Sequence, residues 1–229
     1  MPMKIVVVAA HPDDEVLGMG GTLCKHSDNG DEIHVLFISD GVTGRDYNYD
    51  PIKSKDEINK RKEMADQASK KYKAASIEFL DYPNLRLDME YILKITKDIE
   101  ALIFKYRPEI VYSHHSNDTN IDHRITSQAT IFACRPIPGS SIKTIRLFEI
   151  PSSTEYSHSS IGSPFEPNCF SDISKYFDLK IAMLRDYDYE MRQFPHPRSS
   201  KAIEARDNYR GTSIGIDYAE AFAEIRNIF

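Results

Sequence analysis

The sequence predicts an α/β fold in which helices cover both faces of a mostly parallel β-sheet. Strand and helix patterns alternate along residues 4–150, and such alternation is typical of parallel sheets. The run KIVVVAA at 4–10 is apolar after its lysine, as expected for a strand buried on both faces. The 229 residues suit one domain spanning 1–229, because no repeat or linker divides the chain.

The first five strands and first four helices follow from their residue patterns. Short apolar or β-branched runs predict strands at 4–10, 32–39, 76–81, 109–113 and 143–150. Apolar residues at helical spacing predict helices at 15–29, 55–73, 88–106 and 122–134. Pro108 ends the third of these helices, since proline removes a backbone donor and clashes with the preceding turn.

The last third of the chain departs from this rhythm. Pro, Ser, Gly and Asn interrupt residues 151–170, which predicts an irregular segment that is either a plain connector or a substrate-contacting loop. A helix is expected at 172–193, where Ile173, Phe177 and Ile181 recur at helical spacing. The run DYAEAFAEIRNI predicts a final helix at 217–228.

Charge and cysteine content exclude several classes of protein. The formal net charge of −6 argues against nucleic acid or an anionic membrane as the main partner. No apolar run reaches the roughly 18 residues of a membrane span, and the start does not resemble a signal peptide, so we expect a cytoplasmic protein. Three cysteines without a C-x-x-C pair indicate neither a disulfide framework nor a thiolate zinc site.

Polar clusters follow three of the predicted strands. They are HPDDE at 11–15, DGVTGR at 40–45 and HHSNDTNIDHR at 114–124. Because ligands of open parallel sheets bind at the carboxyl ends of the strands, all three clusters are expected around one crevice.

The first cluster carries residue types that bind a catalytic metal. Zinc in catalytic sites usually takes three protein ligands and leaves one position for water, and His11 and Asp14 can reach one ion across a turn. The third ligand is expected from the last cluster, which offers His114, His115 and His123.

Neighbouring acids are expected to have separate roles. Asp13 can take a proton from water beside the metal, as a general base does. We expect Glu15 to open the following helix, near the positive end of its dipole, and Asp122 to orient neighbouring ligands by hydrogen bonds.

Two other chemistries fit the sequence less well. The glycines at 18–21 fall inside the predicted helix and do not match G-x-G-x-x-G, so they indicate close helix packing rather than a phosphate loop. No cysteine stands beside a histidine motif, which argues against a cysteine nucleophile.

The motifs AHPDDE at 10–15 and DTNIDHR at 118–124 resemble those of the PIG-L/LmbE-like family of zinc-dependent N-deacetylases. The likeness extends over almost the whole chain through SDGVTGR at 39–45, FPHPRS at 194–199 and RGTSIGIDYAEAF at 210–222. It implies a Rossmann-like fold and removal of acetyl groups from N-acetylglucosamine conjugates or related amides. Position by position it implies His11, Asp14 and His123 as Zn²⁺ ligands, with other divalent metals as alternatives, and Asp13 as general base.

The resemblance also bears on substrate contacts and on the general acid. It implies that Arg45 contacts the polar end of the substrate. Several family members have a histidine where this chain has Asn120, which can donate a hydrogen bond but cannot protonate a leaving amine. We therefore expect His196 in FPHPRS to act as the acid, with His115 as second candidate.

The resulting hypothesis is a metal-dependent hydrolase that acts on an acetylated amino sugar or sugar conjugate and that assembles, as the family often does, into a homo-oligomer. Two alternatives stay open at this point. One is an amidase of the same chemistry acting on a non-sugar amide such as a thiol conjugate. The other is a sugar- or nucleotide-binding protein that lacks catalysis.

Overall fold

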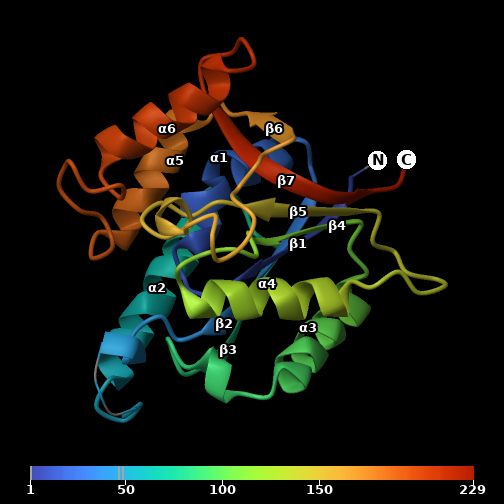
Figure 1. Cartoon of the computed structure of the whole chain (residues 1–229), viewed down its shortest axis with the longest axis vertical. Helices are drawn as coiled ribbons and strands as arrows, with labels where there is room; N and C mark the ends of the chain where they lie inside the picture. Colours follow the sequence, from blue (N-terminus) through green and yellow to red (C-terminus); the bar gives the residue numbers. More distant parts are fainter. Residues whose placement is uncertain (1, 46, 48) are drawn as a thin grey trace.

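All seven strands in the described part of the chain belong to one sheet (Figure 1). The computed structural model describes residues 2–45, 47 and 49–229. The sheet has the order β3-β2-β1-β4-β5-β7-β6. Its members are β1 (Lys4–Ala9), β2 (Glu32–Ser39), β3 (Ser76–Tyr82), β4 (Ile110–His114), β5 (Thr144–Phe148), β6 (Cys169–Asp172) and β7 (Ala219–Asn227). Strands β1 to β5 run parallel and β7 pairs antiparallel with β5 and β6, which confirms the mostly parallel, Rossmann-like sheet.

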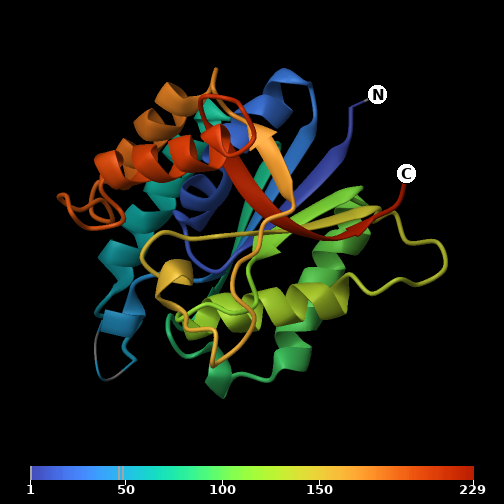
Figure 2. The ribbon, with the colours of Figure 1, turned by 45° about the horizontal axis from the view of Figure 1, so that its top comes forward.

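Helices cover both faces of this sheet, as expected (Figure 2). One face carries α1 (Asp14–Asp28), α2 (Lys55–Lys71), α5 (Phe177–Leu184) and α6 (Ser200–Thr212). The other carries α3 (Ile92–Tyr106) and α4 (Ile121–Ala133). The run in β1 serves both cores, because Ile5, Val7 and Ala9 face the first layer while Val6 and Val8 face the second.

The predicted first five strands and first four helices are all present, with shifts of a few residues at their ends. The C-terminal region differs more. The expected helix at 172–193 is shorter, comprising α5 and the 3₁₀ turn η4 (Arg185–Tyr187), and the sequence patterns did not predict β6 or α6.

The predicted helix at 217–228 is wrong, because these residues form β7. This strand pairs with β5 on one side and β6 on the other, so its backbone groups are satisfied by neighbours far away in sequence. Its side chains alternate between the layers, with Phe222 in the first core and Ala223 against the second. The helical propensity of the alanines was overridden by these tertiary contacts.

Close packing explains the glycines of α1, as predicted. A Cβ atom at Gly18 would lie 2.6 Å from the Phe148 ring, and one at Gly21 would lie 2.7 Å from Ile173. Between them the helix is kinked at Met19, whose φ and ψ are −153° and 26°. The Glu220 carboxylate accepts hydrogen bonds from the N–H groups after the kink, at 2.9 Å from Gly21 N and 2.7 Å from Thr22 N. The glycines therefore contribute to packing and not to a phosphate loop.

The sheet order reverses at β1, which pairs with β2 on one side and β4 on the other. After β1 the chain continues into α1 on one face of the sheet, and after β4 it continues into α4 on the other face. A crevice therefore opens beyond the carboxyl ends of these two strands. Residues 11–15 follow β1 and residues 114–124 follow β4. The fold thus brings the two motif segments to one place.

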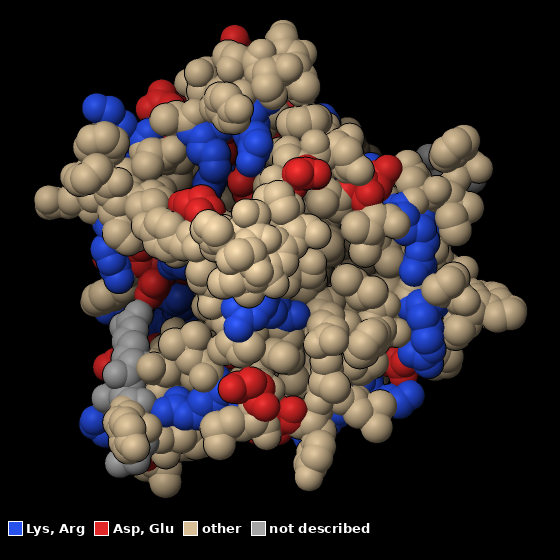
Figure 3. Space-filling model, in the orientation of Figure 1, with Lys and Arg blue, Asp and Glu red and all other residues tan. Residues whose placement is uncertain are grey.

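The molecular surface is mixed in charge. On the face in Figure 3, acidic and basic side chains are interspersed, and no continuous basic area is visible there. In the part of the chain that the structure describes, no helix combines the length and apolar character that crossing a bilayer requires.

We expect Gly18→Ala to destabilise the protein, although alanine normally favours a helix. The added methyl group would overlap the Phe148 ring, and overpacking of this kind costs about 1–3 kcal/mol of unfolding free energy. Chemical denaturation would measure this loss, with Gln67→Ala on the exposed face of α2 as the control. Equal stability of Gly18→Ala and the original chain would contradict the packing role.

Candidate active site

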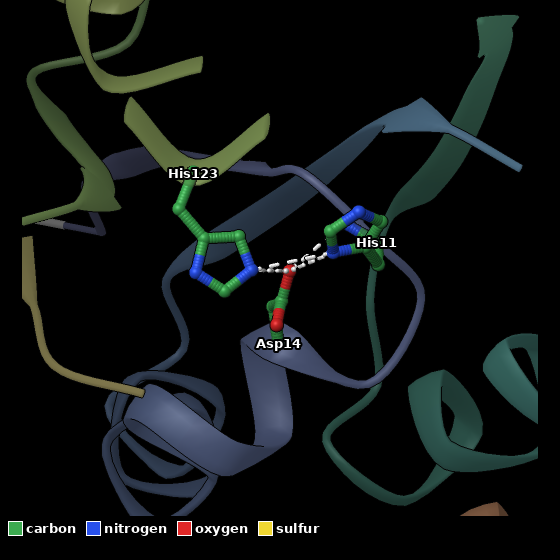
Figure 4. Close-up of side chains that lie close together, drawn as sticks. All are labelled: His11, Asp14 and His123. Atoms are coloured by element: carbon green, nitrogen blue, oxygen red, sulfur yellow. Dashed lines mark hydrogen bonds and ion pairs between the residues drawn. The ribbon is translucent and has the colours of Figure 1, made fainter. Parts of the chain in front are cut away.

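Three side chains expected to bind metal meet at the crevice: His11, Asp14 and His123 (Figure 4). His11 lies just beyond β1, Asp14 is the first residue of α1, and His123 lies in the first turn of α4. Asp14 Oδ2 is 3.1 Å from His11 Nδ1 and 3.4 Å from His123 Nε2, and the two nitrogens are 3.3 Å apart. All three residues are buried.

This arrangement fits a tetrahedral metal ion. Zinc bonds to imidazole nitrogen and carboxylate oxygen are about 2.0–2.2 Å long, which places neighbouring ligand atoms of a tetrahedron about 3.3–3.5 Å apart. The three observed separations lie close to this range. Asp14 Oδ1 is also buried and makes no hydrogen bond among the described residues. Two nitrogens and one oxygen are a donor set typical of catalytic zinc, so the residues present fit the ion.

Each histidine is oriented through its second ring nitrogen. Asp122 Oδ2 lies 3.1 Å from His11 Nε2, and its carboxylate also accepts hydrogen bonds from Leu85 N and Leu87 N. The predicted orienting role of Asp122 therefore applies to His11. Such carboxylate contacts fix the ring and increase the basicity of the ligating nitrogen.

Asp118 orients His123, a role that sequence reasoning did not assign. Its Oδ2 atom lies 3.3 Å from His123 Nδ1. Ser153 and Thr154 donate hydrogen bonds to the same oxygen, over 3.0 and 2.7 Å. Both hydroxyl groups come from the irregular segment at 151–170, so part of that segment supports the site. The only sequence signal for Asp118 was its place within DTNIDHR.

Without metal, the charges of the cluster favour protonated ligands. Burial lowers the pKa of His11, but the Asp122 and Asp14 carboxylates raise it to about 10. Burial likewise opposes the charged form of His123, whose pKa Asp14 and Asp118 raise to about 9. A metal ion must therefore replace protons on both imidazoles.

The other two candidate histidines make different contacts. His114 Nε2 accepts a hydrogen bond of 2.8 Å from Ala10 N, and its ring stacks on that of His123. Burial lowers the pKa of His114 to about 3, so it is neutral. His115 Nε2 lies 3.2 Å from the Ser163 carbonyl oxygen and contacts the segment at 151–170. His114 Nε2 also lies 3.5 Å from Asp14 Oδ2, but the Ala10 N–H occupies it, so His123 is the histidine that completes the group with His11 and Asp14.

Asp13 lies beside the ligands in a strained backbone conformation. Its φ of 131° is rare for a residue with a side chain, and such strain costs about 1–3 kcal/mol. The buried Glu15 helps to hold it, since Glu15 Oε2 accepts from Asp13 N over 3.0 Å and Oε1 accepts from the Tyr187 hydroxyl over 2.7 Å. Burial raises the pKa of Glu15 to about 8. Glu15 lies in the first turn of α1, as expected, and its two hydrogen bonds connect that turn to Asp13 and Tyr187.

Two arginines hold the Asp13 carboxylate. Arg198 Nη1 lies 2.9 Å from Asp13 Oδ2, and Arg61 Nη2 lies 3.4 Å from the same atom. Glu190 bridges both arginines, at 2.7 Å from Arg61 Nη1 and 3.2 Å from Arg198 Nη1. Burial raises the pKa of Asp13, and the two guanidinium groups oppose that shift. The sequence signalled none of these three partners, apart from the place of Arg198 in FPHPRS.

A cavity of about 200 Å³ gives access to this group. His11, Asp13 and Asn120 line it together with Arg61, Glu190 and Arg198. Asn120 caps α4, because its Oδ1 accepts a hydrogen bond from Asp122 N, and its Nδ2 makes no hydrogen bond to any described residue. That Nδ2 donor is available to a ligand in the cavity.

The structure does not show His196 or the side chain of Arg45 in contact with the cavity. His196 is half-buried, its Nδ1 accepts a hydrogen bond from Arg198 N, and it is not among the described residues that line the cavity. Arg45 ends the 3₁₀ turn η1 (Thr43–Arg45), and its side chain lies outside the described part of the structure. Both assignments stay predictions.

Fold and site together define an α/β protein with a group of side chains that could hold a metal ion at the switch point of its sheet. The family model PIG-L, described as GlcNAc-PI de-N-acetylase, matches residues 6–134, which is more than half of the chain. The chain therefore belongs to the PIG-L family, as its motifs predicted.

Similarity to known relatives covers almost the full length of the chain. A diacetylchitobiose deacetylase from Thermococcus kodakarensis is 24% identical, covering 99% of this chain and 84% of the relative. The solved N,N′-diacetylchitobiose deacetylase from Pyrococcus horikoshii superposes with a TM-score of 0.78 at 22% identity, over 98% of this chain and 84% of that one. A 4-oxalmesaconate hydratase from Pseudomonas putida is 27% identical over 96% of this chain and 88% of its own length. Most of these similarities are to enzymes that cleave N-acetyl amides.

We expect metal binding at neutral pH to release about two protons per ion, since His11 and His123 must lose theirs to coordinate it. Affinity should increase as the pH rises towards about 9 and 10, the pKa values of the metal-free ligands. Calorimetric titration of Zn²⁺ in buffers of different ionisation enthalpy would count the protons. Binding without proton release would contradict the assigned ligand set.

Removal of the Asp118 carboxylate should weaken metal binding without removing a ligand. We expect Asp118→Ala to lower zinc affinity about 10–100-fold, because His123 loses the group that orients it. Competition with a chromophoric chelator would measure the change, and Asp88→Ala at an exposed position serves as control. Unchanged affinity in Asp118→Ala would show that the contact is not functional.

Proposed function

We propose that this chain is a zinc-dependent N-deacetylase that hydrolyses the acetamide of an N-acetylglucosamine-type sugar or sugar conjugate. The observation that carries the proposal is the cluster of His11, Asp14 and His123 beside a cavity that His11 and Asp13 line. Membership of the PIG-L family and similarity to sugar deacetylases support the same chemistry. The products are acetate and a free amino sugar.

His11, Asp14 and His123 would hold the ion, which supplies Lewis-acid polarisation of a carbonyl group and a water molecule of lowered pKa. Asp13 is the base that accepts a proton from the attacking water. Arg61 and Arg198 fix its carboxylate, and Glu15 fixes its backbone N–H. Asn120 Nδ2 supplies a hydrogen bond to the oxygen that becomes negative as the tetrahedral intermediate forms.

Release of the amine requires a proton. His196 stays the predicted donor, and its position two residues before Arg198 keeps it close to the network around Asp13. Asp13, having accepted a proton in the first step, is a second source. Loss of at least about tenfold in turnover in His196→Ala supports the histidine, whereas full activity assigns the step to Asp13.

The central test is Asp13→Asn, which removes the base and preserves the shape of the side chain. We expect turnover to fall about 10²–10⁴-fold while zinc content stays near one ion per chain, because Asp13 is not a ligand. Acetate release and elemental analysis measure the two quantities, with Asp56→Asn on the exposed start of α2 as control. Loss of zinc together with activity would instead make Asp13 part of the metal site.

Hydration of an unsaturated carboxylate is a second candidate, favoured by the similarity to the Pseudomonas putida hydratase. The residues that line the cavity favour hydrolysis of an amide over hydration of an unsaturated carboxylate. Its two arginines are already paired with Asp13 and Glu190, so a highly anionic substrate would have to compete with these carboxylates. Assays of N-acetylated sugars, thiol-conjugate amides and unsaturated carboxylates in parallel would separate these reactions. Metal-free sugar binding without turnover would favour a binding protein instead.

The proposal also covers the metal ion, the cellular compartment and the oligomeric state of the protein. We propose zinc from the donor set, and a cytoplasmic location because Cys24, Cys134 and Cys169 are free thiols, as in reducing compartments. A homo-oligomer stays a prediction that light scattering of the purified chain would test.

A further inference from the structure

The proposed chemistry gives no role to Glu190, a charged residue that lines the active-site cavity. It lies in the segment between η4 and α6 and is only 9% exposed. A buried carboxylate is costly unless positive groups offset the loss of its hydration. Arg61 and Arg198 supply these positive groups. The three side chains therefore form one electrostatic unit.

Each carboxylate oxygen of Glu190 faces a different arginine. Its Oε1 lies 2.7 Å from Arg61 Nη1, and its Oε2 lies 3.2 Å from Arg198 Nη1. Guanidinium groups recognise carboxylates through charge-assisted hydrogen bonds of this kind, whether the carboxylate belongs to a side chain or to a ligand. The space between the two arginines is thus a carboxylate site that a side chain of the same chain already fills.

Other contacts hold both arginines, so the site keeps its shape independently of the carboxylate between them. Arg198 Nε donates a hydrogen bond to Ser152 Oγ over 2.9 Å, and Arg198 Nη1 lies 2.9 Å from Asp13 Oδ2. Arg61 Nη2 approaches the same Asp13 oxygen at 3.4 Å. The Arg61 guanidinium carbon also lies 5.9 Å from the centre of the Tyr187 ring. Removal of the carboxylate between the arginines would therefore leave two oriented guanidinium groups beside the cavity.

The charges of this group balance while Glu190 is present. Arg61 and Arg198 carry two positive charges, and Asp13 and Glu190 carry two negative charges. Without Glu190, one positive charge would be left over at a mostly buried position, where Coulomb interactions are stronger than in water. That charge would attract an anion into the cavity. With Glu190 in place, a neutral amide meets a balanced group.

We propose that Glu190 is a specificity-determining residue of the active-site cavity. Its carboxylate fills the anion position between Arg61 and Arg198, so that small carboxylates, including the acetate product, do not bind there beside Asp13. The cavity is thereby selective for a neutral acetamide. This consequence for substrate and product rests on the proposed function, whereas binding of a free carboxylate at the anion position is measured without turnover.

The test is Glu190→Ala, which removes a methylene and a carboxylate group that together have the size of acetate. We expect this variant to bind acetate at least about tenfold more tightly than the original chain, because acetate can take the emptied position between the arginines. Titration of the full chain with isotope-labelled acetate after metal removal, followed by NMR, measures the affinity without coordination to an ion. Acetamide, which has the same shape and no charge, should gain no affinity. Glu57→Ala, at an exposed position of α2, removes the same atoms and is the control that should leave acetate binding unchanged.

A second variant and a second measurement separate a change in binding from a loss of folding. Glu190→Gln keeps the shape of the side chain and removes its charge. Its acetate affinity should rise by a smaller factor, because the amide still fills the position between the arginines. Thermal unfolding with and without acetate is the second measurement. Acetate should raise the melting temperature of Glu190→Ala more than that of the original chain or of Glu57→Ala, since a ligand stabilises the folded state that binds it.

The possible outcomes separate the role of Glu190 from the proposed function. No gain in acetate affinity in either Glu190 variant, or equal gains for acetate and acetamide, would overturn that role. A gain that is confined to acetate and absent from Glu57→Ala supports it, even if the zinc-loaded chain releases no acetate from any amide. In that case the deacetylase proposal fails while the anion position stands. Acetate release by the zinc-loaded chain, without any gain in the Glu190 variants, is the reverse result.

Discussion

The buried carboxylate of Asp14 is the charge around which the rest of the site is arranged. It accepts a hydrogen bond from His11 N and lies within 3.4 Å of ring nitrogens of His11 and His123. Burial opposes its charge, but the surrounding imidazoles keep its pKa well below the usual range. A buried anion of this kind is tolerated only where positive groups offset its desolvation. Protons on the histidines do so without metal, and a divalent cation does so in the loaded site.

Two further acids hold the rings of the two histidines. Asp122 fixes His11 and Asp118 fixes His123, and both carboxylates are themselves held by donors from distant segments. Asp118 accepts hydrogen bonds from the hydroxyl groups of residues 153 and 154, so the irregular segment after β5 supports the group of candidate metal ligands. The Asp13 carboxylate differs from these two acids, because its partners are guanidinium groups. Neighbouring acids in HPDDE therefore experience different surroundings.

The same residues connect the chemistry to substrate recognition. Arg61 contacts Asp13 on one side and Glu190 on the other, and it lines the active-site cavity. A ligand that extends along this pair would contact the residues that fix the proposed base.

The sequence by itself determined the parallel half of the fold and the centre of the site. Residues 4–10 predicted a strand buried on both faces, and HPDDE at its end indicated His11, Asp13 and Asp14 as candidate site residues, because such side chains are costly to bury without a ligand. Choosing His123 over its neighbours required the family resemblance, since spacing alone left His114 and His115 equally open.

Only the tertiary structure decided the C-terminal part of the sheet and the partners of the Asp13 carboxylate. β7 was mistaken for a helix, because its alanines favour a helix locally and its pairing with β5 and β6 involves residues far away in sequence. In the sequence, Arg61 resembles the other charged residues of an exposed helix. In the fold, α2 packs beside the crevice and buries Arg61 against Asp13. Periodicity and motifs describe local order along the chain, whereas these contacts depend on which distant segments the sheet brings together.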